Sequence, residues 1–298
     1  MTARKFFLFL SICLSTTFCA TAQYYEAGIM IGTSNYFGDI HPDGLAPKEY
    51  NMAYGLFGRY NINRFFAFKA SLFQGTISGS DSNNTLRSGL RERNLNFKTS
   101  VIELAVTNEF HLAPLEIRKG NISVPYLFAG IGAFYFNPQA ELDGTWHNLQ
   151  PLGTEGQGTT NATLEKYSRV SVAIPFGFGM KISINEQINI GVEMGMRKTI
   201  TDYLDDVSSN YPDIDQLQNV NPLGAALAYR TPEFYSETME NPVGTLRGNP
   251  DDQDWYFMGG VTVSINLTNQ QGLEWERKYK KFEGMKREKK TLDDAAEF

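Results

Sequence analysis

The sequence predicts an all-β fold, an eight-stranded antiparallel transmembrane β-barrel with long loops at one end. Three observations support this prediction: eight stretches alternate between apolar and small or polar residues, short and long connections alternate between them, and an export-type leader comes first. In a barrel that spans a membrane, one face of each strand meets lipid and the other lines the interior. A secreted barrel of the lipocalin kind is the alternative, and it would have polar outer faces.

The first 22 residues are expected to be a signal peptide. Arg4 and Lys5 provide the positive start, an apolar stretch follows, and residues 20–22 form a small-residue cleavage site. Both cysteines of the chain, Cys13 and Cys19, lie within this leader. The mature chain is therefore expected to lack cysteine, which excludes thiol catalysis, disulfides and cysteine-ligated zinc.

The first four predicted strands occupy residues 25–36, 51–60, 66–72 and 97–110. In the first of them, Ile29 and Ile31 alternate with Gly28 and Gly32. The tight turn 61–63 joins the second strand to the third. A period of two residues indicates a strand whose two faces meet different surroundings.

The last four predicted strands occupy residues 124–136, 170–182, 188–197 and 257–267. The second of these has the longest apolar face, made of Val170, Val172, Ile174, Phe176, Phe178, Met180 and Ile182. A tilted membrane strand needs about 9 to 11 residues, and most of the eight stretches reach that length. Because no later stretch has the roughly 18 uncharged apolar residues of a membrane helix, the chain is expected to cross the membrane as a closed barrel.

The connections between the predicted strands differ in length. Short connections lie near 61–64, 112–121 and 185–187, and long polar ones near 38–50, 75–96, 137–167 and 199–254. Outer-membrane barrels have short periplasmic turns and longer external loops. The expected location is the outer membrane of a Gram-negative bacterium, with both termini in the periplasm. The expected organisation is a signal peptide (1–22), an outer-membrane barrel (23–267) and a charged periplasmic tail (268–298).

The inward faces of the predicted strands carry charge. Four acidic and four basic residues are expected to face the interior: Glu26, Arg59, Lys69, Glu103, Glu109, Lys181, Glu193 and Arg197. An eight-stranded barrel is only wide enough for side chains to fill it, and buried charges need partners. The balanced charge favours a packed network of salt bridges over an ion or proton path, so the protein is not expected to be a pore by itself.

The sequence offers no catalytic, cofactor or metal site, so the protein is not expected to be an enzyme. The three histidines, His41, His111 and His147, lie far apart without metal-ligand spacing. A membrane enzyme that uses His147 near Ser168 is the remaining enzymatic alternative. The net charge of −6 argues against a nucleic-acid partner.

An acidic segment begins the last long connection. Residues 201–208 include Asp202, Asp205 and Asp206, which are three acids within five residues. Such a group can bind calcium, cap a short helix, or pair with Arg197 and Lys198. The sequence leaves these three alternatives open.

The charged tail carries one aromatic stripe. Trp275, Tyr279 and Phe282 are spaced at i, i+4 and i+7, which places them on one face of a helix. This face is a candidate partner-binding element for a protein or a membrane surface. A solvated tail without such a role is the alternative.

Several segments in order along the chain resemble a family of small outer-membrane barrels from Bacteroidota, whose best-known member is PorG of the type IX secretion system. The resemblance rests on residues 26–28, 35–39, 58–61, 93–97, 151–157, 174–177, 201–208 and 247–249. It implies a non-enzymatic barrel, without a cofactor, that attaches to a periplasmic ring lipoprotein and helps assemble a protein-export and gliding machine. The implied partners are outer-membrane lipids and that lipoprotein. An outer-membrane transport or ligand-binding barrel that uses its long external loops is the alternative function.

Overall fold

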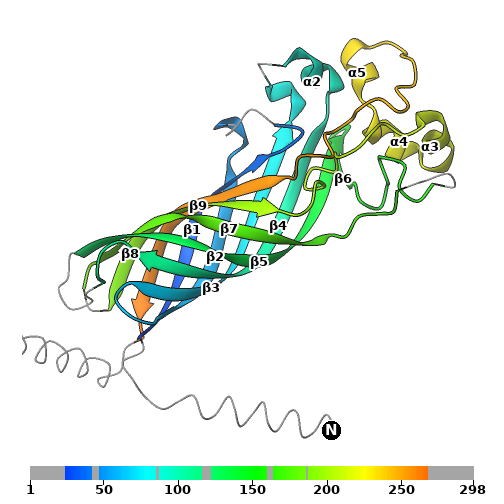
Figure 1. Cartoon of the computed structure of the whole chain (residues 1–298). Helices are drawn as coiled ribbons and strands as arrows, with labels where there is room; N and C mark the ends of the chain where they lie inside the picture. Colours follow the sequence, from blue (N-terminus) through cyan, green and yellow to red (C-terminus); the bar gives the residue numbers. More distant parts are fainter. Residues whose placement is uncertain are drawn as a thin grey trace, which may run out of the picture.

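The protein folds into a closed β-barrel of tilted strands, with a cluster of loops and short helices at one end (Figure 1). The computed structural model describes residues 24–41, 47–84, 87–115, 122–159, 164–185 and 187–267. The expected signal peptide and the charged tail, with Trp275, Tyr279 and Phe282, lie outside these residues. The barrel strands are β1 (Tyr24–Phe37), β2 (Asn51–Asn61), β3 (Phe66–Ser80), β4 (Asn96–His111), β5 (Ile122–Leu142), β7 (Val170–Ser183), β8 (Ile188–Thr199) and β9 (Trp255–Asn266).

Antiparallel pairing closes these strands into a ring. The order is β4-β3-β2-β1-β9-β8-β7-β5, and β5 pairs again with β4. A short ninth strand, β6 (Thr145–Asn148), extends the far end of β5 as a hairpin. Closure leaves none of the eight described barrel strands with an unpaired sheet edge, as a lipid environment demands. The predicted eight-stranded antiparallel barrel is confirmed.

The outer wall of the barrel is apolar all the way round. Each barrel strand presents at least one large apolar side chain that is 41–62% exposed: Ile29, Leu56, Leu72, Leu104, Ile131, Phe178, Val192 and Val263. Soluble monomers rarely expose a continuous apolar surface of this extent, because contact with water costs about 25 cal/mol per Å² of apolar area. The wall is therefore suited to hydrocarbon chains, and the barrel is a transmembrane one.

Tight asparagine turns join strands at one end, here called the turn end. Asn63 Oδ1 accepts hydrogen bonds from the backbone N–H groups of Phe65 (2.8 Å) and Phe66 (2.9 Å) between β2 and β3. Asn185 Oδ1 accepts from the N–H groups of Gln187 (2.8 Å) and Ile188 (2.7 Å) between β7 and β8. Asparagine favours such turns because its side chain mimics the next backbone carbonyl.

Two strands are longer than the sequence pattern predicts. β3 continues to Ser80 and β5 to Leu142, into segments that their Gly, Ser, Thr and Asn content marks as loop. The ladder nevertheless continues there, with Ser78 opposite Lys98 and Asn137 opposite Ser100. The reason is that these ladders extend beyond the apolar wall, where the outward residues are polar and the buried inward ones, such as Ile77 and Phe136, are apolar, so the pattern of the lipid-facing part is not continued.

Short helices gather at the opposite end, here called the loop end (Figure 1). They are η2 (Pro47–Glu49), η3 (Asp81–Asn83), α2 (Ser88–Arg93), α3 (Ile214–Val220), α4 (Pro222–Ala228) and α5 (Thr231–Tyr235). Asp213 and Asn221 cap α3 and α4 by accepting hydrogen bonds from the N–H groups of Gln216 and Gly224. None of the helices in the described ranges has the length and apolar character needed to cross a membrane.

Candidate functional site

The interior of the barrel holds all eight charged residues that the sequence places there. None is more than 4% exposed: Glu26, Arg59, Lys69, Glu103, Glu109, Lys181, Glu193 and Arg197. The strand register explains how they meet, since Glu26 lies opposite Arg59 and Arg59 lies opposite Lys69 on the next strand. Side chains that lined a water-filled channel would be exposed to solvent, so this interior is packed.

Six of the eight charges form one chain of ion pairs. Arg59 pairs with Glu26 on one side and donates from Nη2 to Glu109 Oε1 (3.0 Å) on the other. Lys181 Nζ extends the chain beyond Glu26, at 2.8 Å from Glu26 Oε2. At the other end, Lys69 Nζ lies 3.7 Å from Glu109 Oε1 and 2.6 Å from Glu193 Oε1. Every charge in the chain therefore has an opposite neighbour.

The remaining two charges form a second pair nearer the loop end. Arg197 Nε lies 3.4 Å from Glu103 Oε2, and Arg197 Nη1 donates to the carbonyls of Gly195 (2.7 Å) and Met258 (3.1 Å). Tyr256 donates its phenol proton to Glu103. Aromatic rings fill the space between the charges, with the Lys69 ammonium 5.1 Å from the Phe128 ring centroid. This network stiffens the wall and blocks the interior.

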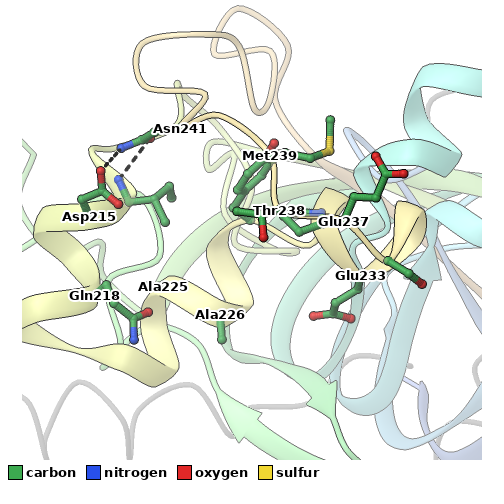
Figure 2. A pocket seen from close by; sticks show the side chains of 13 residues that line it. Asp215, Gln218, Ala225, Ala226, Glu233, Glu237, Thr238, Met239 and Asn241 are labelled. Atoms are coloured by element: carbon green, nitrogen blue, oxygen red, sulfur yellow. Dashed lines mark hydrogen bonds between the residues drawn. The ribbon is translucent and has the colours of Figure 1, made fainter.

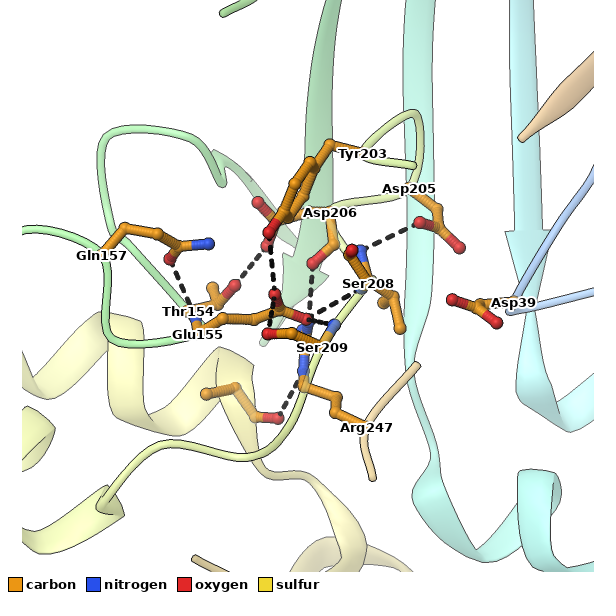
Figure 3. A network of polar contacts seen from close by, with 12 residues as sticks. Asp39, Thr154, Glu155, Gln157, Tyr203, Asp205, Asp206, Ser208, Ser209 and Arg247 are labelled. Carbon is orange, nitrogen blue, oxygen red and sulfur yellow. Dashed lines mark hydrogen bonds and ion pairs between the residues drawn. The ribbon is translucent and has the colours of Figure 1, made fainter. Parts of the chain in front are cut away.

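The loop end carries a second polar network, and we call the described residues 38–41, 81–84, 87–95, 149–159, 164–169 and 199–254 the cap. Figure 3 shows its centre, where Arg247 reaches Glu155 among the backbone of three connections. Arg247 Nη1 lies 3.0 Å from Glu155 Oε1 and donates to the carbonyl of Asp206 (2.5 Å). Its Nε donates to the carbonyl of Ala228 (3.3 Å). One buried guanidinium thus joins segments far apart in the sequence.

Glu155 and Arg93 complete this centre. Glu155 accepts hydrogen bonds from the N–H groups of Ser208 (2.9 Å) and Ser209 (3.1 Å), as Figure 3 shows. Arg93 forms two hydrogen bonds of 2.8 Å with the Asp81 carboxylate. It also donates to the carbonyls of Arg247 (2.6 Å) and Asp39 (2.9 Å). The cap is therefore a single cross-linked body rather than a set of separate loops.

A buried phenol joins two carboxyl groups beneath the cap. Tyr36 Oη lies 2.5 Å from Asp205 Oδ2 and 2.8 Å from Asp254 Oδ1, and all three residues are at most 1% exposed. A phenol has one proton to donate, so the second short contact requires a proton on one of the two carboxyl groups. Burial, reinforced by the charge of Asp39, raises the pKa of Asp205 to about 8. Burial and neighbouring Asp205 raise the pKa of Asp254 well above its ordinary value.

The acidic segment 201–208 is part of the same network. Burial raises the pKa of Asp202 to about 9 and that of Asp206 to about 6. Asp206 accepts hydrogen bonds from Thr154 and from the Tyr167 phenol (2.6 Å). Within the described ranges, no three acidic, histidine or cysteine side chains are grouped to hold a metal ion. Asp205 and Asp206 act as hydrogen-bond acceptors that hold the cap together.

Sequence reasoning missed the residues that organise the cap. In the sequence, Arg93, Glu155 and Arg247 are recognisable only as members of the segments that resemble the outer-membrane family, and nothing there assigns them a role of their own. The signal that could have found them lies in those segments, because 93–97, 151–157, 201–208 and 247–249 all come together here.

The histidines do not form a common site in the structure. His111 is buried near the turn end, with Nδ1 3.3 Å from the carbonyl of Arg64. His41 follows β1 and His147 lies on β6, both at the loop end. Ser168, the suggested companion of His147, hydrogen-bonds through Oγ to the carbonyl of Val170 (3.0 Å).

Comparison with known proteins gives solved structures and one family. The N-terminal β-barrel domain of Pseudomonas aeruginosa OprF is 9% identical, with a TM-score of 0.34, over 83% of this chain and 98% of that chain. The Yersinia pestis attachment invasion locus protein Ail, in complex with the heparin analogue sucrose octasulfate, is 8% identical, with a TM-score of 0.39, over 82% and 99%. Neisserial surface protein A is 10% identical, with a TM-score of 0.36, over 82% and 97%.

The search of curated proteins gives no match to this chain. Residues 4–225, about three quarters of the sequence, match the family described as "Domain of unknown function (DUF6089)". The chain therefore belongs to this family.

Proposed function

We propose that this protein is a non-enzymatic barrel of the outer membrane of a Gram-negative bacterium, where it serves as an anchor and assembly component of a type IX protein secretion and gliding machine. The apolar wall supports a membrane location. The resemblance of segments along the chain to the Bacteroidota barrel family supports the choice of machine. In this arrangement the loop end faces outward and both termini lie in the periplasm.

The packed interior of the barrel is the main observation that supports an anchoring role. Lys69, Arg59 and Arg197 place their charged groups across the lumen against buried carboxylates. A barrel whose interior is filled in this way has no room for a passing solute, which argues against the transport alternative. The protein therefore acts through what it presents at its two ends. The turn end and the tail from residue 268 are the parts that reach a ring lipoprotein in the periplasm.

Deleting residues 268–298 is expected to abolish co-purification of a periplasmic lipoprotein partner from detergent-extracted membranes. The barrel itself is expected to remain in the membrane fraction, because its ion pairs and apolar wall lie within residues 24–267. The measurement is affinity purification of the full-length and truncated proteins after mild cross-linking of cells, followed by mass spectrometry of the bound proteins.

A matched pair of triple variants separates the aromatic stripe from the tail as a whole. Replacing Trp275, Tyr279 and Phe282 by alanine is expected to lose the partner, because large aromatic side chains supply most of the energy of docking. Replacing Glu276, Lys280 and Glu283, which have the same spacing one residue later, is expected to retain it. Recovery of no periplasmic lipoprotein with the full-length protein would refute the anchoring role.

A further inference from the structure

Two cation–aromatic pairs lie on the outside of the barrel at the loop end, where β5 is a neighbour of both β4 and β6 (Figure 1). The Lys98 ammonium on β4 lies 3.8 Å from the centroid of the Trp146 ring on β6. The Arg169 guanidinium, just before β7, lies 5.6 Å from the ring centroid of Tyr135 on β5. The attraction between a cation and the face of an aromatic ring holds each pair in place. We call these four residues the basic patch.

A row of amide side chains connects the two pairs. Arg169 Nη1 donates to Asn137 Oδ1 (3.2 Å). Asn137 Nδ2 and Gln139 Nε2 both donate to Asn148 Oδ1, each at 2.8 Å. Gln139 in turn lies opposite Lys98 in the ladder between β4 and β5. Arg169 and Lys98 therefore lie on one continuous surface.

The basic patch lies directly beyond the apolar wall. Tyr135 is paired with Ile102 on β4 and with Val170 on β7, which are 42% and 61% exposed. Arg169 immediately precedes Val170, and Lys98 lies four residues from Ile102 toward the loop end. At about 3.3 Å per residue and a tilt of about 40°, four residues correspond to roughly 10 Å along the membrane normal. Because the polar layer of a bilayer is roughly 5–8 Å thick on each side, the two cations lie at the depth of the lipid headgroups.

Neither cation of the basic patch is neutralised by a carboxylate. In the part of the chain that the structure describes, Lys98 and Arg169 form no ion pair, whereas Arg59 and Lys69 in the interior are paired. Glu141 lies opposite Trp146 on the neighbouring strand, and its carboxylate is paired with neither cation. An anion that reached the basic patch would therefore gain charge-assisted hydrogen bonds without displacing an existing partner.

The surface of the cap has the opposite charge. Figure 2 shows exposed carboxylates of Asp215, Glu233 and Glu237 among the side chains that line a pocket between α3, α4 and α5. Negative charge on the cap and unpaired positive charge at the edge of the wall together direct an anionic group to the basic patch rather than to the cap. The edge of the wall is where the headgroups of the surrounding lipids lie.

We infer that the basic patch binds the phosphate group of an anionic lipid in the leaflet at the loop end, with Lys98 and Arg169 donating to the phosphate oxygens. Continuity with the wall favours a lipid over a soluble anion, because acyl chains can cover Ile102 and Val170 while the phosphate meets the two cations. In the orientation proposed above, this is the outward-facing leaflet. The inference needs the transmembrane barrel but not the secretion machine.

The test is a titration of the mature protein in detergent micelles with dioleoyl phosphatidic acid, measured by native mass spectrometry. The Lys98→Gln/Arg169→Gln variant is expected to weaken binding about tenfold, because two charged contacts with the phosphate are lost. Arg91→Gln/Lys166→Gln is the matched control, because both residues are exposed in the cap and Lys166 already donates to the carbonyl of Pro151 (2.7 Å). This control is expected to change the affinity no more than about twofold, since salt screens distant charges.

A charge-retaining variant separates the role of charge from that of the fold. Lys98→Arg/Arg169→Lys is expected to bind phosphatidic acid within about threefold of the unaltered protein, because both positive charges remain. Dioleoyl phosphatidylcholine, whose headgroup has no net charge, is expected to bind more weakly than phosphatidic acid. Inorganic phosphate is expected not to displace the bound lipid, because it lacks acyl chains.

Four results would overturn the inference. They are equal binding of the two lipids, equal effects of the glutamine variant and the cap control, loss of binding in the charge-retaining variant, and displacement of the lipid by inorganic phosphate. The last would indicate a site for a soluble anion. Failure to recover a periplasmic lipoprotein with the tail would leave all of these outcomes unchanged, so the two proposals fail separately.

Discussion

Replacing Arg59 with methionine is expected to destabilise the barrel by roughly 3–5 kcal/mol, the usual cost of leaving a buried charge without its partner. Arg59 lies between Glu26 and Glu109, and all three side chains are buried. Methionine fills part of the same space but provides neither charge nor donors. Within the described chain of ion pairs, two cations, Lys181 and Lys69, would then remain against three carboxylates, those of Glu26, Glu109 and Glu193.

Urea unfolding of the protein in lipid vesicles, followed by tryptophan fluorescence, measures this loss. Arg91→Met is the matched control, because Arg91 is exposed on α2, and it is expected to shift stability by less than about 0.5 kcal/mol. Adding Glu109→Gln to Arg59→Met is expected to recover part of the loss by removing one of the carboxylates left behind. Equal stability of Arg59→Met and the unaltered protein would show that the interior charges are not paired as described.

Raising the pH from 5 to 9 is expected to loosen the cap without unfolding the barrel. The pKa of Asp205 is about 8 and that of Asp202 about 9 in the folded cap, against an ordinary aspartate value of 3.8. Between these values the folded cap holds protons that an opened cap releases. The stabilisation is therefore fully present below about pH 4 and is lost as the pH rises through 8 to 9.

The charges around Asp205, Asp202 and Asp254 explain why raising the pH destabilises the cap. Asp39 repels Asp205 and Asp205 repels Asp254 once they are ionised, and Tyr36 hydrogen-bonds to both Asp205 and Asp254, which requires a proton on one of these two carboxyl groups. Asp202 adds to the repulsion at Asp254, and Glu155 to that at Asp202. The positive charge of Arg93 opposes the shift of Asp205 but does not cancel it. Deprotonation thus places uncompensated negative charge where the cap joins β1 and β9.

Hydrogen–deuterium exchange of residues 202–209 tests this expectation. Protection factors, which remove the intrinsic pH dependence of exchange, are expected to fall at least about tenfold between pH 6 and pH 9, since one unit of pKa shift corresponds to a factor of ten. Asp205→Asn is expected to flatten this dependence, and Asp251→Asn, on an exposed turn, to leave it as it is. Protection that rises with pH, or that Asp205→Asn does not alter, would contradict the raised pKa of Asp205 in the folded cap.

The barrel could be predicted from the sequence because its signal is local. Each strand shows the two-residue alternation by itself. This alternation identifies the outward residues, such as Leu104, and the inward charged residues, such as Glu103. The same local signal failed at the upper parts of β3 and β5. There the strands leave the apolar wall, so the outward residues become polar while the inward ones, such as Ile77 and Phe136, are buried and apolar, and the pattern of the lipid-facing part is not continued.

The cap could not be predicted because its contacts join residues far apart in the chain. Arg93 meets Arg247 across 154 positions, and Tyr36 meets Asp254 across 218. Such contacts leave no periodic pattern in the sequence. An arginine that is buried in a polar loop cannot be told from an exposed one by the residues around it. For the same reason the sequence leaves the role of the acids in residues 202–206 open between calcium binding, helix capping and pairing with Arg197 and Lys198. It shows the number of acids but not the hydrogen-bond donors that reach Asp205 and Asp206.

The most direct test of a lipid-covered barrel wall is the reactivity of single introduced cysteines in lipid nanodiscs. Because the mature chain is expected to lack cysteine, only the introduced thiol should react. A cysteine at Leu104, the outward residue of mid-β4, is expected to resist a water-soluble maleimide, because hydrocarbon chains cover it. A cysteine at Asp251, on an exposed turn of the cap, is expected to react fully, and both are expected to react after denaturation. Equally fast reaction of the Leu104→Cys and Asp251→Cys variants in nanodiscs would show that water, not lipid, surrounds the barrel wall.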